Sequence, residues 1–249
     1  MRARVGPLAR LAPRASACFN EFHCGTPCAP RAGRSPLAWA MHLTPRMTTQ
    51  TDFMRRVPTV SLRDPLGEFL GALPEGGTFE YSYLDAVKLC GHSCPTVARG
   101  YLLTVVALRA LYGEETPVRG ELEVTVGGTP DDGSTGPLAS VVSLLTGAAT
   151  ETGFGGLAGR WARRGLLHFD LALADVIRFR RRDTGATVEV SLDASVAPSL
   201  PGLRASLVAA LAPDATPAQQ RTFATQWQGR VEQLLTADPA RAVRVHRVS

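Results

Sequence analysis

The stretch Gly91-His92-Ser93-Cys94-Pro95 constrains this chain more than any other, because it joins two predicted helices. The apolar spacing over residues 80–90 predicts the first helix, and Gly91 suits the position just after its end. Pro95 suits the first turn of a second helix, where its missing N–H costs nothing, and apolar residues continue that helix to Gly113. The pattern therefore places Cys94 at the start of a helix.

Cys94 and His92 are the candidate catalytic and metal-binding residues. Unpaired N–H groups and the positive end of the dipole at a helix start favour thiolate over thiol, the form that a metal ligand or a nucleophile requires. His92 supplies either a second ligand or a base. Since an isolated Cys is more often a small buried hydrophobe, an inert role stays open beside metal binding and metal-free thiol chemistry.

The segment GHSCPTVARGYLLTVVALRALYG resembles the signature of the FmdE family of formylmethanofuran dehydrogenase proteins, in which Gly-His-x-Cys-Pro precedes a Gly-containing apolar helix. A second block, residues 138–169, resembles the family's Thr-Gly-rich segment, which is followed by a Gly-rich turn and a strand. The resemblance covers about residues 78–195. It implies a dimeric, metal-binding α+β core in which His92 and Cys94 are ligands.

Three positions depart from the family pattern. Pro137, Ser140 and Ala148 stand near the places where family members carry Cys, Asp and Cys, and no Cys follows Cys94 to form a C-terminal zinc ribbon. The resemblance therefore does not supply a full set of ligands. A third interpretation, a non-catalytic dimerising module that has lost its site, stays open.

Further ligands must come from other residues, from a second protomer or from water, because a metal site needs three or four ligands. His168 is the candidate third ligand, since it alternates with Leu167 and Phe169 in a predicted strand and faces away from them. Zinc is the metal that we expect, with iron or nickel as alternatives, and weak ligands would leave a position open for a small molecule. The acidic candidates for the same site are Asp131, Asp132 and Glu151.

A Gly-rich turn follows the second block. Gly153, Gly155 and Gly156 would let the backbone approach a bound ligand, so we predict that this turn lines the pocket at Cys94. A tight turn without a ligand is the alternative. The arginines after the turn are candidates for binding an anionic substrate or for plain solubilisation: Arg160, Arg163 and Arg164.

The remaining periodicity predicts the fold class α+β, with helices packed on one face of a mainly antiparallel sheet. A capping box at Thr216 with Gln219 opens a final helix, whose apolar stripe packs on the core or on a dimer mate. The other predicted elements are strands over 120–126, 166–173, 176–181 and 186–192, the last two joined as a hairpin, and a helix over 138–145. We predict one domain over residues 47–249.

The charge excess lies in a tail over residues 1–46. The chain carries a net charge of +5, and this tail holds seven Arg and one acidic residue, which leaves 20 basic and 21 acidic residues in 47–249. A nucleic-acid-binding domain should carry its basic face on the domain, so nucleic acid is not an expected partner. The tail has six Pro and no apolar periodicity; we predict that it is disordered, and that Met47 is an alternative start.

The sequence disfavours both a membrane-spanning protein and a disulfide-bonded secreted protein. No stretch of about 18 apolar residues exists, so no membrane span is expected. Five Cys, of which Cys18, Cys24 and Cys28 lie in the tail, fit a reducing cytoplasm better than a disulfide framework. We therefore expect a cytoplasmic protein; the family resemblance implies a homodimer, and the open metal position implies a small-molecule ligand.

Overall fold

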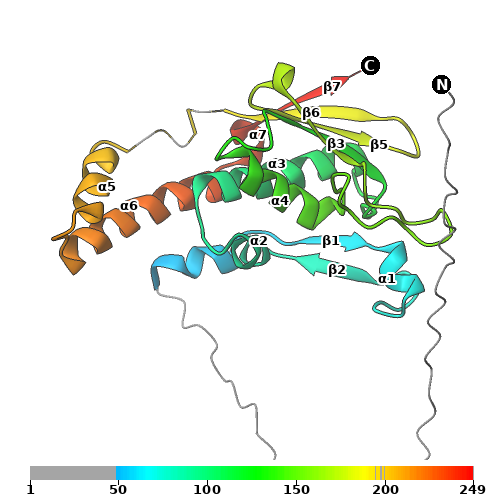
Figure 1. Cartoon of the computed structure of the whole chain (residues 1–249), viewed down its shortest axis with the longest axis horizontal. Helices are drawn as coiled ribbons and strands as arrows, with labels where there is room; N and C mark the ends of the chain where they lie inside the picture. Colours follow the sequence, from blue (N-terminus) through cyan, green and yellow to red (C-terminus); the bar gives the residue numbers. More distant parts are fainter. Residues whose placement is uncertain (1–48, 194, 197, 199, 249) are drawn as a thin grey trace, which may run out of the picture. The chain divides into compact units, whose positions relative to one another are not determined.

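The computed structural model describes residues 49–193, 195, 196, 198 and 200–248 (Figure 1). These described residues belong to one compact unit. The predicted tail over 1–46, with its His23 and three cysteines, lies outside the described residues. Among the described residues, no helix has both the length and the apolar character that a membrane span requires.

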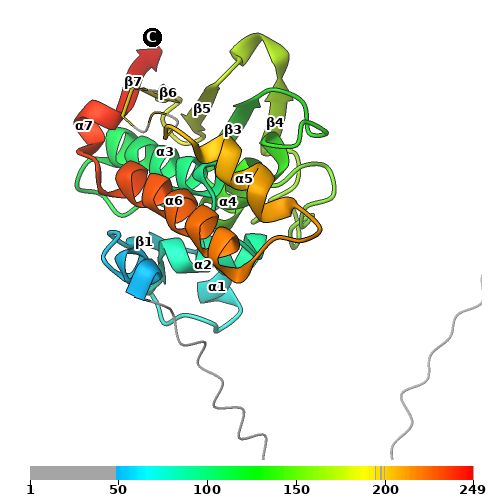
Figure 2. The ribbon, with the colours of Figure 1, turned by 90° about the vertical axis from the view of Figure 1, so that its left-hand side faces the viewer.

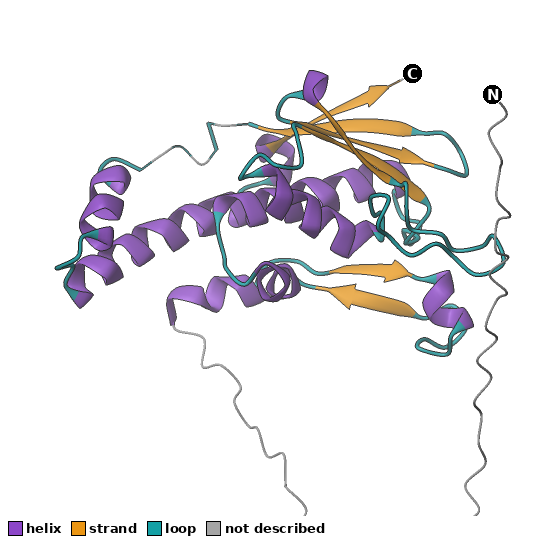
Figure 3. Cartoon of the chain, viewed as in Figure 1, coloured by secondary structure: helices purple, strands orange, loops and turns teal. Residues whose placement is uncertain are grey.

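The larger sheet has five strands in the order β4-β3-β5-β6-β7 (Figure 3). All neighbours are antiparallel except β3 and β4, which are parallel, so the predicted mainly antiparallel sheet is confirmed. The strands are β3 (Leu122–Gly127), β4 (Leu167–Asp170), β5 (Val176–Arg181), β6 (Thr187–Leu192) and β7 (Val243–Val248). A separate antiparallel pair consists of β1 (Val60–Arg63) and β2 (Thr78–Tyr81).

Helices cover one face of the five-stranded sheet, and Figures 1 and 2 show α3, α4 and α6 between this sheet and the layer that contains β1 and β2. Helix α3 contacts β5, β6 and β7, while α4 contacts β3 and α6 runs beside α3. The predicted α+β class is thus confirmed. The helices are α1 (Pro65–Phe69), α2 (Tyr83–Cys90), α3 (Pro95–Tyr112), α4 (Thr135–Thr146), α5 (Leu203–Leu211), α6 (Pro217–Thr236) and α7 (Pro239–Ala242), with 3₁₀ turns η1 (Thr49–Arg55) and η2 (Leu171–Leu173).

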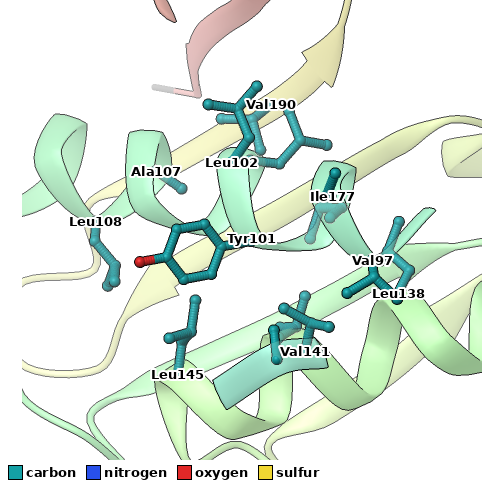
Figure 4. Close-up of a cluster of buried hydrophobic side chains, with 14 of the residues drawn as sticks. Val97, Tyr101, Leu102, Ala107, Leu108, Leu138, Val141, Leu145, Ile177 and Val190 are labelled. Atoms are coloured by element: carbon teal, nitrogen blue, oxygen red, sulfur yellow. The ribbon is translucent and has the colours of Figure 1, made fainter. Parts of the chain in front are cut away.

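The core lies where α3 meets α4 and the sheet (Figure 4). Alternate residues of the strands turn inward in matched rows, as in the row of Val124, Phe179 and Val188, all fully buried. Gly100 lets the two helices approach closely, since a Cβ there would lie 3.2 Å from the Leu138 carbonyl oxygen. The Gly of the apolar helix therefore has a packing role.

A buried ion cluster ties the start of α1 to the second block of the family pattern. Asp64 Oδ2 lies 2.6 Å from Arg119 Nη1, and Asp64 Oδ1 lies 2.7 Å from Arg163 Nη2. Burial lowers the pKa of Arg163, and the negative charge of Asp64 partly offsets this decrease. Gly147 has φ +75°, and a Cβ on it would lie 2.7 Å from Arg163 Nη1. The ion cluster therefore requires a glycine at position 147, in the Thr146-Gly147 pair of the second block.

Several predicted boundaries were wrong. Helix α2 begins at Tyr83 instead of residue 80, because Thr78–Tyr81 pair with β1. Helix α4 begins at Thr135, three residues before the predicted start. The strand predicted over 166–173 ends at Asp170, whose side chain accepts from Ala172 N and so opens η2.

Candidate functional site

The connection between α2 and α3 has the predicted geometry. Gly91, at φ 73°, ends α2 in the left-handed conformation. Cys94 is the N-cap of α3 with an extended backbone, and its Sγ accepts a hydrogen bond from Val97 N at 3.4 Å. Pro95 occupies the first helical position. The Cys94 side chain therefore lies at the start of an 18-residue helix, where its sulfur accepts a backbone hydrogen bond.

Cys94 is only 8% exposed, whereas His92 is exposed at the surface of the same connection. Nδ1 of His92 lies 2.9 Å from the carbonyl oxygen of Cys90. Because a carbonyl oxygen only accepts hydrogen bonds, this contact assigns the ring proton to Nδ1. Nε2 of this neutral ring then keeps its lone pair, so Nε2 is the atom to which a metal ion or a proton would bind.

Helix α6 holds the connection in place. The carbonyl oxygen of Ser93 accepts from Trp227 Nε1 and from Gln228 Nε2, both at 3.1 Å. The Ser93 hydroxyl donates to Gln228 Oε1 at 3.0 Å and shares a hydrogen bond with the Tyr83 hydroxyl at 2.9 Å. Burial raises the pKa of Tyr83, an effect that the Ser93 contact partly offsets, so the phenol stays protonated.

The sequence did not identify these positioning residues. The apolar stripe of the last helix predicted that Trp227 packs on the core or on a dimer mate, and it packs against the core. Its indole N–H and the neighbouring Gln228 amide signal a hydrogen-bond partner, since buried polar groups need one. Nothing in the local sequence identifies that partner as Ser93, which precedes Trp227 by 134 residues.

A second thiol lies near the first. Cys90, at the end of α2, is partly buried, and its Sγ donates to the Pro137 carbonyl oxygen at 3.8 Å. Burial, and to a lesser extent the neighbouring Cys94, raise the pKa of the Cys90 thiol. Ser140 donates to the Gly136 carbonyl oxygen. At two places where the family pattern has Cys and Asp, this chain therefore presents a backbone carbonyl and a helix-bound hydroxyl.

His168, the candidate third ligand, lies on strand β4. Nε2 of His168 is 3.6 Å from Glu123 Oε1, and His168 is paired with Thr125 of β3. Since Val124 and Val126 point into the core, Thr125 and His168 lie on the other face of the sheet, away from α3. The contacts of His168 thus give no support to its role beside Cys94, and that role stays a prediction.

The acidic candidates are not brought to the connection either. Asp131, Asp132 and Glu151 are exposed, and Asp132 accepts from Ser134 N and Oγ. Among the residues that the structure describes, no group of three or more His, Cys, Asp or Glu side chains is arranged to hold a metal ion. A metal ion bound at His92 and Cys94 would therefore need further ligands, from water or from a second copy.

The Gly-rich turn folds onto the arginine segment that follows it. A Cβ on Gly153 would lie 3.0 Å from the Arg164 backbone, and one on Gly156 would overlap the Arg160 carbonyl oxygen. The glycines thus permit a close chain crossing. Gly155 faces the Arg164 side chain at a looser distance. That the turn also lines a pocket at Cys94 stays a prediction.

A cavity of about 510 Å³ lies beside this turn, between α4, β4 and residues 149–152. Its lining includes Ser140 and Thr150 together with the exposed Leu89 of α2. Gly153, Gly155, Gly156, His92 and Cys94 are not among the lining residues. The cavity therefore adjoins the second block without reaching the two candidate ligands.

The arginines have structural partners. Arg163, proposed as a candidate for binding an anionic substrate, is buried in the Asp64 cluster, so that interpretation was wrong for this residue. Arg160 stacks 4.1 Å above the Trp161 ring. Each arginine between residues 178 and 182 forms an ion pair with a carboxylate. Arg178 pairs with Glu189, Arg180 with Glu123, Arg181 with both Glu115 and Asp183, and Arg182 with Glu121. This run is therefore not an unpaired basic face.

Residues 89–244 match the family described as FmdE, molybdenum formylmethanofuran dehydrogenase operon. The chain belongs to the FmdE family. The match begins one residue before Cys90 and includes the helix–Gly-His-Ser-Cys-Pro–helix connection, the Asp64-bound Arg119 and Arg163, and the α6 residues that hold Ser93. The FmdE match also extends past β6 into β7, beyond the resemblance carried by the two sequence blocks. The chain matches no curated protein.

Proposed function

We propose that this FmdE-family protein binds one divalent metal ion, zinc in the first instance, through His92 Nε2 and the Cys94 thiolate. The observation that carries the proposal is the hydrogen bond from His92 Nδ1 to the Cys90 carbonyl oxygen. Metal-binding histidines characteristically donate their other ring N–H to a carbonyl or carboxylate, which fixes both the tautomer and the ring orientation. His92 has this arrangement with its second nitrogen at the surface.

The Cys94 environment supports the second ligand. A thiol must lose its proton to bind zinc, and the Val97 N–H already donates a hydrogen bond to the Cys94 sulfur at the start of α3. The Trp227 and Gln228 contacts to Ser93 fix the residue between the two ligands. His92 and Cys94 are therefore held at a set spacing, which lowers the entropic cost of binding.

Two protein donors leave positions open on the ion. In such a site, the metal would act as a Lewis acid toward a small bound molecule. We propose that water and a donor from a second copy complete the coordination, in a cytoplasmic homodimer as the family resemblance implies. Iron and nickel are the alternatives to zinc. A reaction related to one-carbon metabolism, or an accessory role in it, is the functional class that the resemblance favours.

A second candidate function is metal-free thiol chemistry, with Cys94 as the nucleophile and His92 Nε2 as the base. It is favoured by the hydrogen bond from Val97 N to the Cys94 sulfur, because reactive cysteines commonly lie at the start of a helix. Cys90 offers an internal comparison, because burial raises the pKa of its thiol and slows alkylation. In metal-free protein, Cys94 should therefore react faster than Cys90 despite its lower exposure.

The test is the metal content of the full chain, purified without an affinity tag and measured by elemental analysis. We expect one equivalent in the wild type, and loss of the metal in His92→Ala and in Cys94→Ser. The matched controls are His246→Ala, which alters an exposed histidine of β7, and His168→Ala, which asks whether that residue contributes. Retention of the metal in both His92→Ala and Cys94→Ser would refute the proposal. A metal-free wild type with rapid alkylation of Cys94 would favour thiol chemistry.

A further inference from the structure

A second cavity, of about 420 Å³, lies between α3, the end of α6 and the end of η1. None of its lining residues belongs to the connection at His92 and Cys94. The volume is within the range of about 300–1,000 Å³ that is typical of small-molecule sites. This cavity therefore offers a binding site that is independent of the proposed metal function.

The interior of the cavity is apolar. Its floor is formed by Val57, Tyr101, Leu102 and Leu235, each at most 7% exposed. Val105 and Val106 of α3 are less buried and form one wall. A ligand that fills the cavity must therefore present an apolar body to it.

The polar atoms inside the cavity are already paired. The Tyr101 hydroxyl donates to the Pro58 carbonyl oxygen at 2.8 Å and also lies 3.1 Å from the Tyr81 carbonyl oxygen. The Thr236 hydroxyl donates to the Glu232 carbonyl oxygen at 2.8 Å. The interior consequently makes no demand for hydrogen bonds, and an alkyl or aryl group can occupy it without leaving a buried polar group unpaired.

One unpaired cation lies at the rim. Arg109 is exposed, and within the described part of the chain its guanidinium has no hydrogen bond or ion pair. It follows Tyr101 and Val105 at helical spacing, so it lies on the same side of α3 as the apolar wall. Arg56, also at the rim, pairs with Glu232 at 3.1 Å. Asp238 accepts a hydrogen bond from Ala240 N at the start of α7 and has no cationic partner among the described residues, so the carboxylate of a ligand must lie at the Arg109 end of the rim.

We infer that this cavity binds an amphipathic monocarboxylate, with its apolar chain against Val105 and Val106 and its carboxylate on Arg109. A guanidinium binds a carboxylate through two parallel hydrogen bonds, which an ammonium cannot reproduce. The floor excludes a second charge, because nothing in it would pair with one. The ligand is thus a medium-chain alkyl or aryl carboxylate, not a polyanion.

Titration calorimetry with decanoate, below the concentration at which it forms micelles, tests this site in the full chain. We expect saturable binding of decanoate and much weaker binding of decanol and decylamine. Arg109→Gln should weaken decanoate binding by about tenfold to a hundredfold, the value of a charge-assisted hydrogen bond, and Arg109→Lys should restore part of it. Val106→Trp, which fills the cavity, should abolish binding.

The matched control is Arg221→Gln, which removes the same charge about 20 Å from Leu235 along α6. It should leave decanoate binding unchanged. Equal weakening by Arg221→Gln, equal affinity for decylamine, or no saturable binding by the folded wild type would overturn the inference. If the wild type binds no decanoate and Val106→Trp changes the oligomeric state, the inference is overturned, because the cavity is then part of an interface between copies of the chain.

Discussion

Replacement of Asp64 by Ala should destabilise the fold more than any other single change in the polar interior. The Asp64 side chain is 5% exposed and accepts from Arg119 and Arg163 at 2.6 and 2.7 Å. It also caps α1 by accepting from Leu66 N and Gly67 N. Asp64→Ala would leave two guanidinium groups facing each other, with the Arg163 side chain only 9% exposed and its Nη1 without a hydrogen-bond partner among the described residues.

Removal of one partner of a buried ion pair costs about 3–5 kcal/mol, and loss of an N-cap adds about 1 kcal/mol. We therefore expect the free energy of unfolding to fall by about 4–6 kcal/mol, a large part of the usual 5–15 kcal/mol of a domain. With a urea dependence of about 2 kcal/mol per M, the midpoint should fall by about 2–3 M.

Urea titrations followed by tryptophan fluorescence measure this shift. Asp64→Asn is the control, because an amide oxygen keeps the N-cap and one acceptor while the charge is lost. The free energy of unfolding of Asp64→Asn should lie between those of the wild type and Asp64→Ala. A fall of less than about 1 kcal/mol for Asp64→Ala would refute the assignment of Asp64 as the counter-charge of the buried arginines.

Three further predictions concern the connection, the acid response and the tail. Trp227→Phe removes one donor to Ser93, so it should cost about 1 kcal/mol and speed alkylation of Cys94; an unchanged rate by mass spectrometry would mean that α6 does not restrain the connection. The hydrogen bond from Arg181 lowers the pKa of Asp183 to about 2, so its stabilisation is present above the ordinary pKa of about 3.9 and is lost as the pH falls through 2. Asp183→Asn should therefore lose less stability than the wild type in acid melts over that interval, and parallel curves would contradict this. Deletion of residues 1–46 should leave the melting temperature unchanged and move the isoelectric point from about 9.3 to slightly acidic, whereas a clear loss of stability would show that the tail packs.

Local rules predicted the connection at the site well. Gly91 and Pro95 have conformations that adjacent residues largely dictate, and the capping box of Thr216 and Gln219 forms as the sequence indicated. The hairpin of β5 and β6 follows from alternation and a short turn in the same way. These features need only contacts between residues close in sequence.

Contacts between distant residues could not be predicted. Asp64 and Arg163 are 99 residues apart, and a single sequence does not reveal which carboxylate a buried arginine will meet. Strands β1 and β7 are short or mostly exposed, so their apolar pattern is weak. His168 was predicted to face away from Leu167 and Phe169, but periodicity alone does not say which face of the sheet carries the helices.

The most direct test of the proposed site is the ultraviolet and visible absorption spectrum of the full chain titrated with cobalt(II), which replaces zinc and reports its ligands. A Cys94 thiolate bound to cobalt gives an intense sulfur-to-metal charge-transfer band in the near ultraviolet. We expect this band to saturate at one equivalent in the wild type, to disappear in Cys94→Ser, and to weaken in His92→Ala while Cys90→Ser keeps it. A wild type without the band, or a band that survives in Cys94→Ser, would contradict metal binding at His92 and Cys94.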